Sequence, residues 1–191
     1  MEQDVEKLAA ELNKVATRVI VLEHHVSEFI DNLWNADTEA ARNEYNVFAV
    51  PAVVLNGTDG EKILWSPSYE DLKAEVFKIL NDTSEASFDP VTIPTSGKIT
   101  ANGKLKNVSY KAIENARLYA VIYEDIGTSR YHYVVRDITP ATTISKLTPG
   151  NTLDFSLASN ISYNRNKKYY VVIILKSIDT GMILQSFMKK A

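Results

Sequence analysis

The sequence predicts an α/β half followed by an all-β half built as an antiparallel sandwich. Residues 1–82 mix helical apolar periodicity with short β-branched runs. Residues 97–191 lack any long helical pattern and hold short strand-like segments separated by Asn-Gly, Pro-Gly and Thr-Gly turns. Residues 83–96, between the two halves, are rich in Ser, Thr, Asp and Pro and are expected to form a linker.

Helices and strands alternate in the first half. Residues 18–26 are β-branched and apolar without alternation, which is the pattern of a strand covered on both faces. The second helix is expected to begin at Asp37 or Thr38 and the third at Ser66 or Ser68, because Ser, Thr and Asp are favoured N-caps. In chain order the expected elements are helix 4–16, strand 18–26, helix 37–45, strands 47–55 and 61–65, and helix 66–80.

The second half has the strand pattern of a sandwich. Around eight strands are expected, at residues 97–103, 105–113, 116–126, 130–138, 142–147, 152–158, 167–175 and 182–188. Their number and spacing are typical of an immunoglobulin-like or fibronectin-like β-sandwich, which is the expected domain over residues 97–191. We expect its variable edge at residues 141–157.

Charge is divided unevenly between the halves. Residues 1–86 carry 7 Lys and Arg against 17 Asp and Glu, whereas residues 87–191 carry 14 against 7. Three interpretations stay open: two modules that attract each other, a basic module that faces an acidic partner, or two solvated surfaces without a joint role.

Cysteine is absent, which excludes disulfides, thiolate nucleophiles and cysteine-bound metals on this chain. The longest apolar runs, residues 47–55 and 169–175, are much shorter than the ~18 to 20 residues of a membrane-spanning helix, so no span is expected. The N-terminal stretch MEQDVEKLAAEL is acidic and amphipathic and lacks the features of a signal peptide. The protein is therefore expected either to be cytosolic or to be made with a targeting segment that this chain does not hold.

Pro51 divides the apolar run VFAVPAVVL, residues 47–55. Because proline cannot donate a hydrogen bond to a sheet, it must sit at the first residue of a buried strand or at a specially shaped peptide bond. The order strand, helix, strand, turn at Asn56-Gly57, strand, helix, with Val-Pro opening the hairpin, resembles the C-terminal part of the thioredoxin fold. The resemblance implies that the Val50–Pro51 bond is cis and lies beside the position of the family's active-site thiols.

The same resemblance implies that residues 1–82 form an incomplete thioredoxin-like domain. The gap between His25 and Pro51 is too short for two helices and a strand, so residues 18–26 fit the family's second strand. The central first strand and the Cys-x-x-Cys motif are then missing. Three explanations stay open: an upstream segment, a strand borrowed from a second copy, or direct re-pairing of the remaining strands. A homodimer or strand-exchanged oligomer is the expected partner arrangement.

A second resemblance covers nearly the whole chain. The stretches VIVLEHHV, EAARNEYNVFAVPAVVLNG, AVIYED with YVVRDI, and VVIILKSIDTGMILQS, in this order, are similar to the twenty-eight-kilodalton outer-membrane protein family. This resemblance implies an extracytoplasmic location, in the cell envelope or secreted. Many members carry paired cysteines in the thioredoxin-like half, and their absence here argues against redox activity of this chain.

Two adjacent histidines are the first candidates for a site. His24 and His25 lie close to Glu23 and Glu28 in the sequence. Neighbouring side chains on a strand point to opposite faces, so the pair cannot chelate one ion together unless the strand has already ended. An interface or surface role is favoured over a metal site.

Glu124 and Asp125 are the second candidates, because paired carboxylates can do acid/base work. Turn capping, or pairing with Arg136 or Arg130, is favoured since adjacent strand residues diverge. The ten tyrosines could bind nucleic acid or glycans, but structural use in strands is favoured. No phosphate loop, dinucleotide motif, nucleophile elbow or zinc-finger spacing occurs, so no catalytic residue, metal, other cofactor or nucleic-acid partner is expected.

The expected function is that of a non-catalytic envelope or secreted protein that acts through protein–protein contacts. The alternative is the C-terminal part of a thiol–disulfide oxidoreductase whose Cys-x-x-Cys lies upstream of this chain. Two upstream cysteines would favour the alternative, and a strand-exchanged dimer would favour the first hypothesis.

Overall fold

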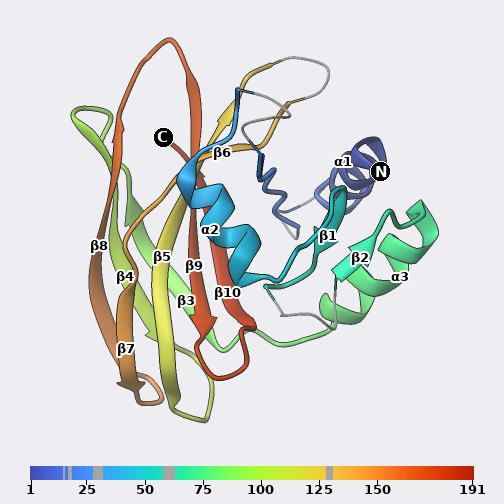
Figure 1. The fold of residues 1–191 in the computed structure, drawn as a ribbon. Helices are drawn as coiled ribbons and strands as arrows, with labels where there is room; N and C mark the ends of the chain where they lie inside the picture. Colours follow the sequence, from blue (N-terminus) through green and yellow to red (C-terminus); the bar gives the residue numbers. More distant parts are fainter. Residues whose placement is uncertain (15, 17–18, 28–31, 58–62, 128–130) are drawn as a thin grey trace.

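The second half of the chain folds into two facing antiparallel sheets. The computed structural model describes residues 1–191 apart from 15, 17–18, 28–31, 58–62 and 128–130 (Figure 1). One sheet has the strand order β3-β4-β8, and the other has the order β10-β9-β5-β6, with β7 also paired to β5. The strands are β3 (Ala86–Thr92), β4 (Lys98–Asn107), β5 (Ile113–Asp125), β6 (Val134–Ile138), β7 (Thr142–Leu147), β8 (Thr152–Ser162), β9 (Lys168–Ser177) and β10 (Ile183–Lys190).

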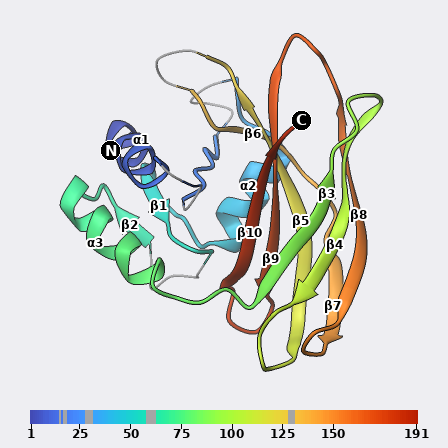
Figure 2. The same ribbon diagram turned by 180° about the vertical axis from the view of Figure 1, so that it is seen from behind.

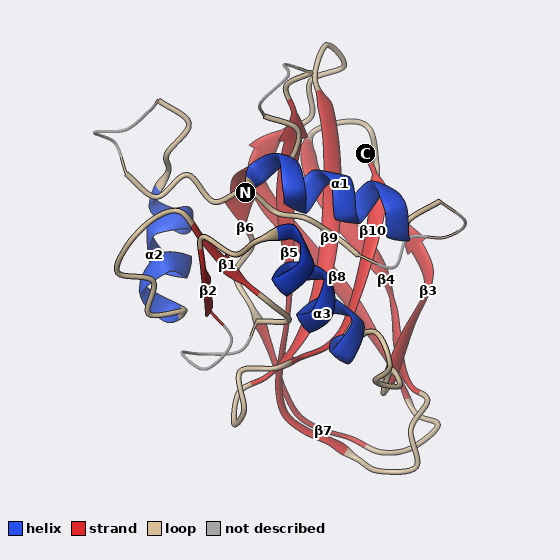
Figure 3. Cartoon of the chain, turned by 90° about the vertical axis from the view of Figure 1, so that its right-hand side faces the viewer, coloured by secondary structure: helices blue, strands red, loops and turns tan. Residues whose placement is uncertain are grey.

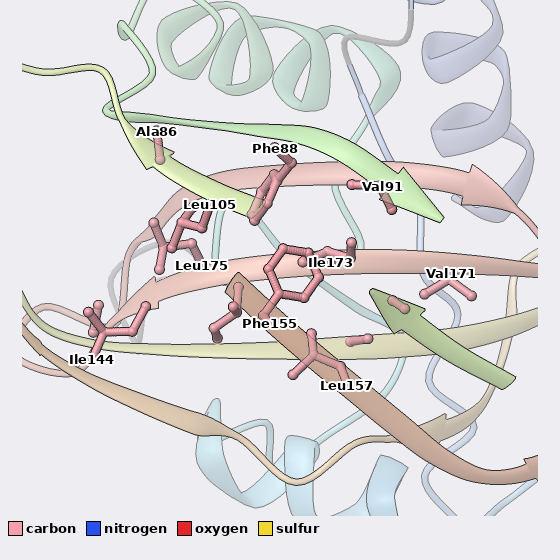
Figure 4. Packing of buried hydrophobic residues seen from close by; sticks show 14 of the residues in the cluster. Ala86, Phe88, Val91, Leu105, Ile144, Phe155, Leu157, Val171, Ile173 and Leu175 are labelled. Carbon is pink, nitrogen blue, oxygen red and sulfur yellow. The ribbon is translucent and has the colours of Figure 1, made fainter. Parts of the chain in front are cut away.

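The two sheets enclose one large apolar core (Figure 4). Side chains alternate along a strand, so Leu118, Ala120 and Ile122 of β5 all point into this core. Phe88 and Phe155, from β3 and β8, meet edge to face with their ring centroids 6.0 Å apart. Burying one large apolar side chain contributes about 1.5–3 kcal/mol, so this core is the main source of the stability of the sandwich.

The five-stranded sheet is buried on its second face as well. Tyr119, Val121 and Tyr123 of β5 point away from the sandwich core and form a second cluster. Ile20 and Leu22, from an extended segment near the N-terminus, pack against this cluster. Residues 118–123 of β5 are therefore continuously apolar and buried, because both faces of the strand are covered there.

The described residues of the first half form a layer beside this outer face, which we call the N-terminal layer (Figures 2 and 3). Helices α1 and α3 pack together with a short hairpin around Leu8, Leu72 and Val76. The Ser68 hydroxyl caps α3 by accepting a hydrogen bond from the Asp71 backbone N–H at 3.2 Å. The elements are α1 (Glu2–Leu12), α2 (Ala36–Glu44), β1 (Ala52–Val54), β2 (Ile63–Trp65) and α3 (Tyr69–Ile79).

The linker expected at residues 83–96 is largely a strand, β3, at the edge of the three-stranded sheet. Its pairing with β4 shifts register between Phe88 and Val91, and Pro90 lies in this irregularity. The linker prediction was wrong because it relied on the Ser, Thr, Asp and Pro content of this segment. A strand can contain proline at a bulge, where the alternation of side chains is interrupted. Gly103 of β4 faces the bulge, and a Cβ there would lie 2.6 Å from the Pro90 carbonyl oxygen. Glycine is therefore needed at this crossing of backbones.

The strand expected at residues 18–26 is also corrected. The described part of this segment makes only one isolated parallel bridge, from Glu23 to Val134. The Glu23 N–H donates to the Tyr133 carbonyl at 2.9 Å, and the Glu23 carbonyl accepts from the Val135 N–H at 3.0 Å. The segment is apolar because it covers the sandwich, not because it lies inside an α/β sheet. The described residues of the first half contain only a two-stranded sheet, β1 with β2.

Element ends differ from expectation at several further places. The strand expected at residues 105–113 is wrong, because β4 continues to Asn107, residues 108–112 form a loop, and β5 begins at Ile113. Helix α2 begins after Asn35, whose side chain accepts from the Thr38 N–H at 3.0 Å, so the N-cap is neither Asp37 nor Thr38. Residues 47–51, expected as strand, precede β1 as an irregular segment. Thr58 to Gly60 of the expected hairpin turn lie outside the described residues.

Candidate interaction surface

Four consecutive apolar residues, Phe48 to Pro51, lie exposed between α2 and β1. Phe48 is 78% exposed and Val50 is 50% exposed, and Trp65 at the end of β2 is 41% exposed. A run of this length at the surface leaves apolar area in water, which folded proteins avoid unless the area binds something. We call Phe48, Ala49, Val50, Pro51 and Trp65 the Phe48 patch.

The Phe48 patch is held in place by its neighbours. The Phe48 and Trp65 rings are 4.5 Å apart between centroids. The Arg42 Nε donates to the Val47 carbonyl at 2.9 Å, which orders the chain that leaves α2. The Val50–Pro51 peptide bond is cis, as the thioredoxin resemblance expects. The ring contact and the Arg42 hydrogen bond reduce the conformational entropy that a partner would have to remove on binding.

The hairpin after the patch is docked on the sandwich through its turn. The Ile183 N–H of β10 donates to the Asn56 carbonyl at 2.9 Å. Gly57 has φ of +69°, and a Cβ there would lie 2.9 Å from the Ile183 side chain. Glycine therefore permits both the left-handed turn and the close approach to β10.

The hairpin has open edges in the part of the chain that the structure describes. Ala52 pairs with Trp65 and Val54 pairs with Ile63, and neither strand pairs with a third strand there. An edge strand leaves backbone N–H and C=O groups available to another extended chain. The patch thus combines exposed apolar side chains with backbone groups that can pair.

A charged cavity of about 230 Å³ lies where the end of α2 meets β5 and β9. Glu44 accepts a hydrogen bond from the Lys176 Nζ at 2.5 Å and another from Arg117. Lys176 is only 3% exposed, and its Nζ also lies 4.3 Å from the centroid of the Tyr45 ring. One carboxylate of the acidic half therefore neutralises a buried cation of the basic half. This ion pair helps to hold the two halves of the chain together.

A second titratable cluster lies where the extended segment meets β6. Burial raises the pKa of Glu23 to about 7, against a weaker opposing hydrogen bond from the Tyr133 N–H, and Glu2 and Glu6 raise it further. Burial lowers the pKa of His24 to about 4. The His24 Nδ1 is shielded from solvent and has no hydrogen-bond partner among the described residues. His24 is therefore a neutral interface residue at neutral pH.

Glu124 and Asp125, at the end of β5, form separate ion pairs. The Glu124 carboxylate is bound by the Arg136 Nε at 2.9 Å and by the Lys167 Nζ at 3.1 Å. The Asp125 carboxylate lies 3.3 Å from the His132 Nδ1. The Asp125 carboxylate also lies 3.7 Å from the Lys168 Nζ, so the two carboxylates are held by different groups.

Of the remaining candidates, the structure describes His25. The His25 ring meets the Tyr131 ring edge-on, with centroids 5.2 Å apart. Glu28 and Arg130 lie outside the described residues. Within the described ranges no group of three or more His, Cys, Asp and Glu side chains is placed to hold a metal ion. No helix in these ranges is both long and apolar enough to cross a bilayer.

The exposure of the Phe48 patch was missed from the sequence. Residues 47–55 were expected as one buried strand because their composition is apolar and β-branched. Pro51 carried the missing signal, since it lacks a donor and restricts the residue before it. The strand β1 begins directly after it, at Ala52, which leaves Phe48 and Val50 outside the sheet.

Comparison with known proteins gives no family. No protein-family model matches the chain, and a search of curated proteins found no match. Among solved structures, a β-glucuronidase from Bacteroides uniformis is 18% identical with a TM-score of 0.39, over 56% of this chain and 12% of that one. The archaellum periplasmic stator protein FlaG from Sulfolobus acidocaldarius is 13% identical with a TM-score of 0.33, over 57% of this chain and 100% of that one. The alkylpurine DNA glycosylase AlkC from Pseudomonas fluorescens is 11% identical with a TM-score of 0.40, over 62% and 34%. The chain thus spans a small part of the glucuronidase, and nothing about function follows from these weak similarities.

Proposed function

We propose that the protein is a non-catalytic scaffold of the cell envelope or the secreted space that acts through protein–protein contacts. The Phe48 patch carries this proposal, because it presents an ordered aromatic pair and four consecutive apolar residues to solvent. The centres of protein interfaces are enriched in aromatic side chains, which contribute much of the binding energy when a partner excludes water from them. The open edges of β1 and β2 add backbone groups for an extended partner.

The architecture that we propose is a degenerate thioredoxin-like scaffold followed by an immunoglobulin-like sandwich. The sheet orders β3-β4-β8 and β10-β9-β5-β6 correspond to the strand groups A-B-E and G-F-C-C′ of immunoglobulin domains, which supports the second part. The hairpin between α1 and α3, with Pro51 before its first strand, supports the first part. The envelope or secreted location rests on the resemblance to the twenty-eight-kilodalton outer-membrane protein family.

Site-specific photo-crosslinking in the native source tests the proposal. A photoreactive amino acid replaces Phe48 in one sample and Ser156, an exposed residue of β8, in a control sample. We expect a discrete crosslinked species from position 48 and none from position 156, because only the first lies in the Phe48 patch. No adduct from position 48, or the same adducts from both positions, would contradict the proposal.

A second candidate function is the C-terminal part of a thiol–disulfide oxidoreductase. The packing of α1, α3 and the hairpin around one small core, with Pro51 at the start of β1, favours it. Because this chain has no cysteine, the exchange would need thiols from an upstream segment. The intact mass of the native protein separates the candidates. A mass of 21.4 kDa without alkylation excludes the oxidoreductase function. A heavier species that takes up two alkyl groups after reduction supports it.

A further inference from the structure

A second exposed apolar site lies on the loop between β4 and β5. Tyr110 is 85% exposed and Val108 is 51% exposed. The Lys111 Nζ lies 5.4 Å from the centroid of the Tyr110 ring, and Lys106 is exposed at the end of β4. We call Lys106, Val108, Tyr110 and Lys111 the Tyr110 patch. Figure 2 shows the β4–β5 connection at the lower end of the sandwich, away from β1 and β2.

The loop that carries the Tyr110 patch is firmly held. Asn107 is fully buried, and its Nδ2 donates to the carbonyls of Lys111 and Leu147, both at 2.8 Å. The Asn107 Oδ1 accepts from the N–H and the hydroxyl of Ser109, both at 2.9 Å. The hydrogen bonds of this side chain therefore shape the loop and attach it to the end of β7. Tyr110 is presented on an ordered support, as an aromatic anchor in an interface needs.

The two patches belong to halves of opposite charge. The Phe48 patch lies in the half with 17 acidic and 7 basic residues, and the Tyr110 patch lies in the half with 7 acidic and 14 basic residues. Two copies that meet through the same patch bring halves of like charge together. Two copies that meet through different patches bring halves of opposite charge together, which favours encounter and correct orientation.

We propose that the Phe48 patch of one copy binds the Tyr110 patch of a second copy, so that the protein associates head to tail. This inference rests on the proposed function and names its partner. Each contact joins two different surfaces and leaves one of each kind free, so the assembly extends into a chain or closes into a ring. Aromatic residues from both copies lie at the centre of the contact, with basic side chains of one copy facing the acidic half of the other.

Mixing two variants of the full chain tests the head-to-tail contact. The first variant, Phe48→Ser with Val50→Ser, removes the Phe48 patch, and the second, Val108→Ser with Tyr110→Ser, removes the Tyr110 patch. Sedimentation velocity over a range of concentrations measures association of the wild type, of each variant and of their equimolar mixture. We expect the wild type to form dimers and larger species. Each variant alone should associate at least about tenfold more weakly, because aromatic anchors dominate such contacts.

The mixture gives the decisive result. Each variant retains the patch that the other lacks, so we expect a one-to-one dimer that grows no further. Ile178→Ser, which changes a side chain that is 52% exposed and lies outside both patches, should associate like the wild type. Circular dichroism confirms that all variants are folded.

Other outcomes would overturn the inference. A wild type that stays monomeric at all concentrations excludes self-association. A second variant that dimerises as well as the wild type shows a symmetric contact through the Phe48 patch. In either case the photo-crosslinking result is separate: an adduct between position 48 and a different protein keeps the proposed function, and no adduct from position 48 removes it as well.

Discussion

Strands of up to 13 residues build the sandwich, whereas the strands of the N-terminal layer have three residues each. In the sandwich, Leu118, Ile173 and Leu175 have no exposed surface. In the layer, the buried core centres on three side chains, with Leu8 and Leu72 the most deeply buried. The sandwich excludes water from its core with its own two sheets. The layer is too small to do so and depends on the outer face of the sandwich.

Polar contacts add to the apolar packing of Ile20 and Leu22 in attaching the layer to the sandwich. The Asn35 Nδ2 donates to the Val135 carbonyl at 2.9 Å, and the Asp37 carboxylate accepts from the Ile138 N–H at 2.9 Å. Trp34 and Trp65 are the only tryptophans, and both lie in the first half of the chain. Tryptophan fluorescence thus follows the layer, while the near-ultraviolet circular dichroism of tyrosine follows mainly the sandwich, because eight of the ten tyrosines lie in the second half of the chain.

Among the variants that compare the two regions, Leu118→Ala should lower the free energy of unfolding most. It leaves a cavity in the sandwich core and is expected to lower the free energy of unfolding by about 2–5 kcal/mol. Both optical signals should shift together in urea denaturation, since the layer has no support once the sandwich unfolds. Leu72→Ala is the matched change in the layer and should shift the fluorescence transition alone. Equal shifts of both signals for Leu72→Ala would show that the two regions form one cooperative unit.

Glu44→Gln should have the next largest effect. It leaves the Lys176 ammonium, which is 3% exposed, without its carboxylate and is expected to destabilise the layer by about 1–3 kcal/mol. Lys176→Met should cost less, because the partly exposed Glu44 keeps water and Arg117 as partners. Urea denaturation followed by fluorescence measures both. If both variants lower the free energy of unfolding equally, the unpaired charge of Lys176 is not the reason for the destabilisation by Glu44→Gln.

Asn35→Ala should have a smaller effect again and lower the free energy of unfolding of the layer by about 1–2 kcal/mol. The change removes both the N-cap of α2 and the hydrogen bond to the Val135 carbonyl. Ser68→Ala removes only the cap of α3 and should cost about 1 kcal/mol or less. The difference between the fluorescence transitions of the two variants measures the contact with the sandwich. If Ser68→Ala destabilises the layer more than Asn35→Ala does, the hydrogen bond from Asn35 to the sandwich does not contribute to stability.

The pH dependence should be the smallest effect. Burial raises the Glu23 pKa from 4.5 to about 7, so its favourable contribution is complete below pH 4.5 and is lost as the pH rises through about 7. Burial lowers the His24 pKa from 6.5 to about 4, so its contribution is complete above pH 6.5 and is lost as the pH falls through about 4. The two dependences oppose each other in the wild type.

Single variants separate the two groups. In Glu23→Gln the stability of the layer should rise between about pH 4 and 6.5, and in His24→Gln it should fall between 4.5 and about 7. For Glu23 we expect about 1 kcal/mol, because its partial exposure screens the effect. Fluorescence-monitored urea denaturation across this range measures both. If the stability of the layer depends on pH in the same way in the wild type and both variants, neither Glu23 nor His24 titrates at a buried contact.

The strands of the sandwich could be predicted because their signals are local. Residues 142–147 were expected as a strand and form β7, the strand expected at 152–158 lies within β8, and the strand expected at 167–175 overlaps β9 from Lys168 onward. Alternation of apolar side chains and turn residues are read from neighbours in the sequence. The third helix could be predicted for the same reason, with Ser68 at its N-cap.

The site was harder to predict, because exposure depends on distant parts of the chain. Residues 19–22 and Phe48 to Val50 are both short runs of apolar residues in the sequence. The first segment covers the sandwich, with Ile20 and Leu22 packed on its outer face, and the second segment faces solvent. In the sequence, only Pro51, directly after the second segment, distinguishes the two outcomes.

By itself, the sequence determined the absence of thiol chemistry, the uneven charge of the two halves, and the order and type of most sandwich strands. Composition and local periodicity are sufficient for these properties. Only the tertiary structure decided that residues 86–92 join the sandwich, that Glu44 neutralises Lys176 and that Phe48 stays exposed. These features depend on which distant surfaces meet, and burial is a property of the assembled fold and not of a segment.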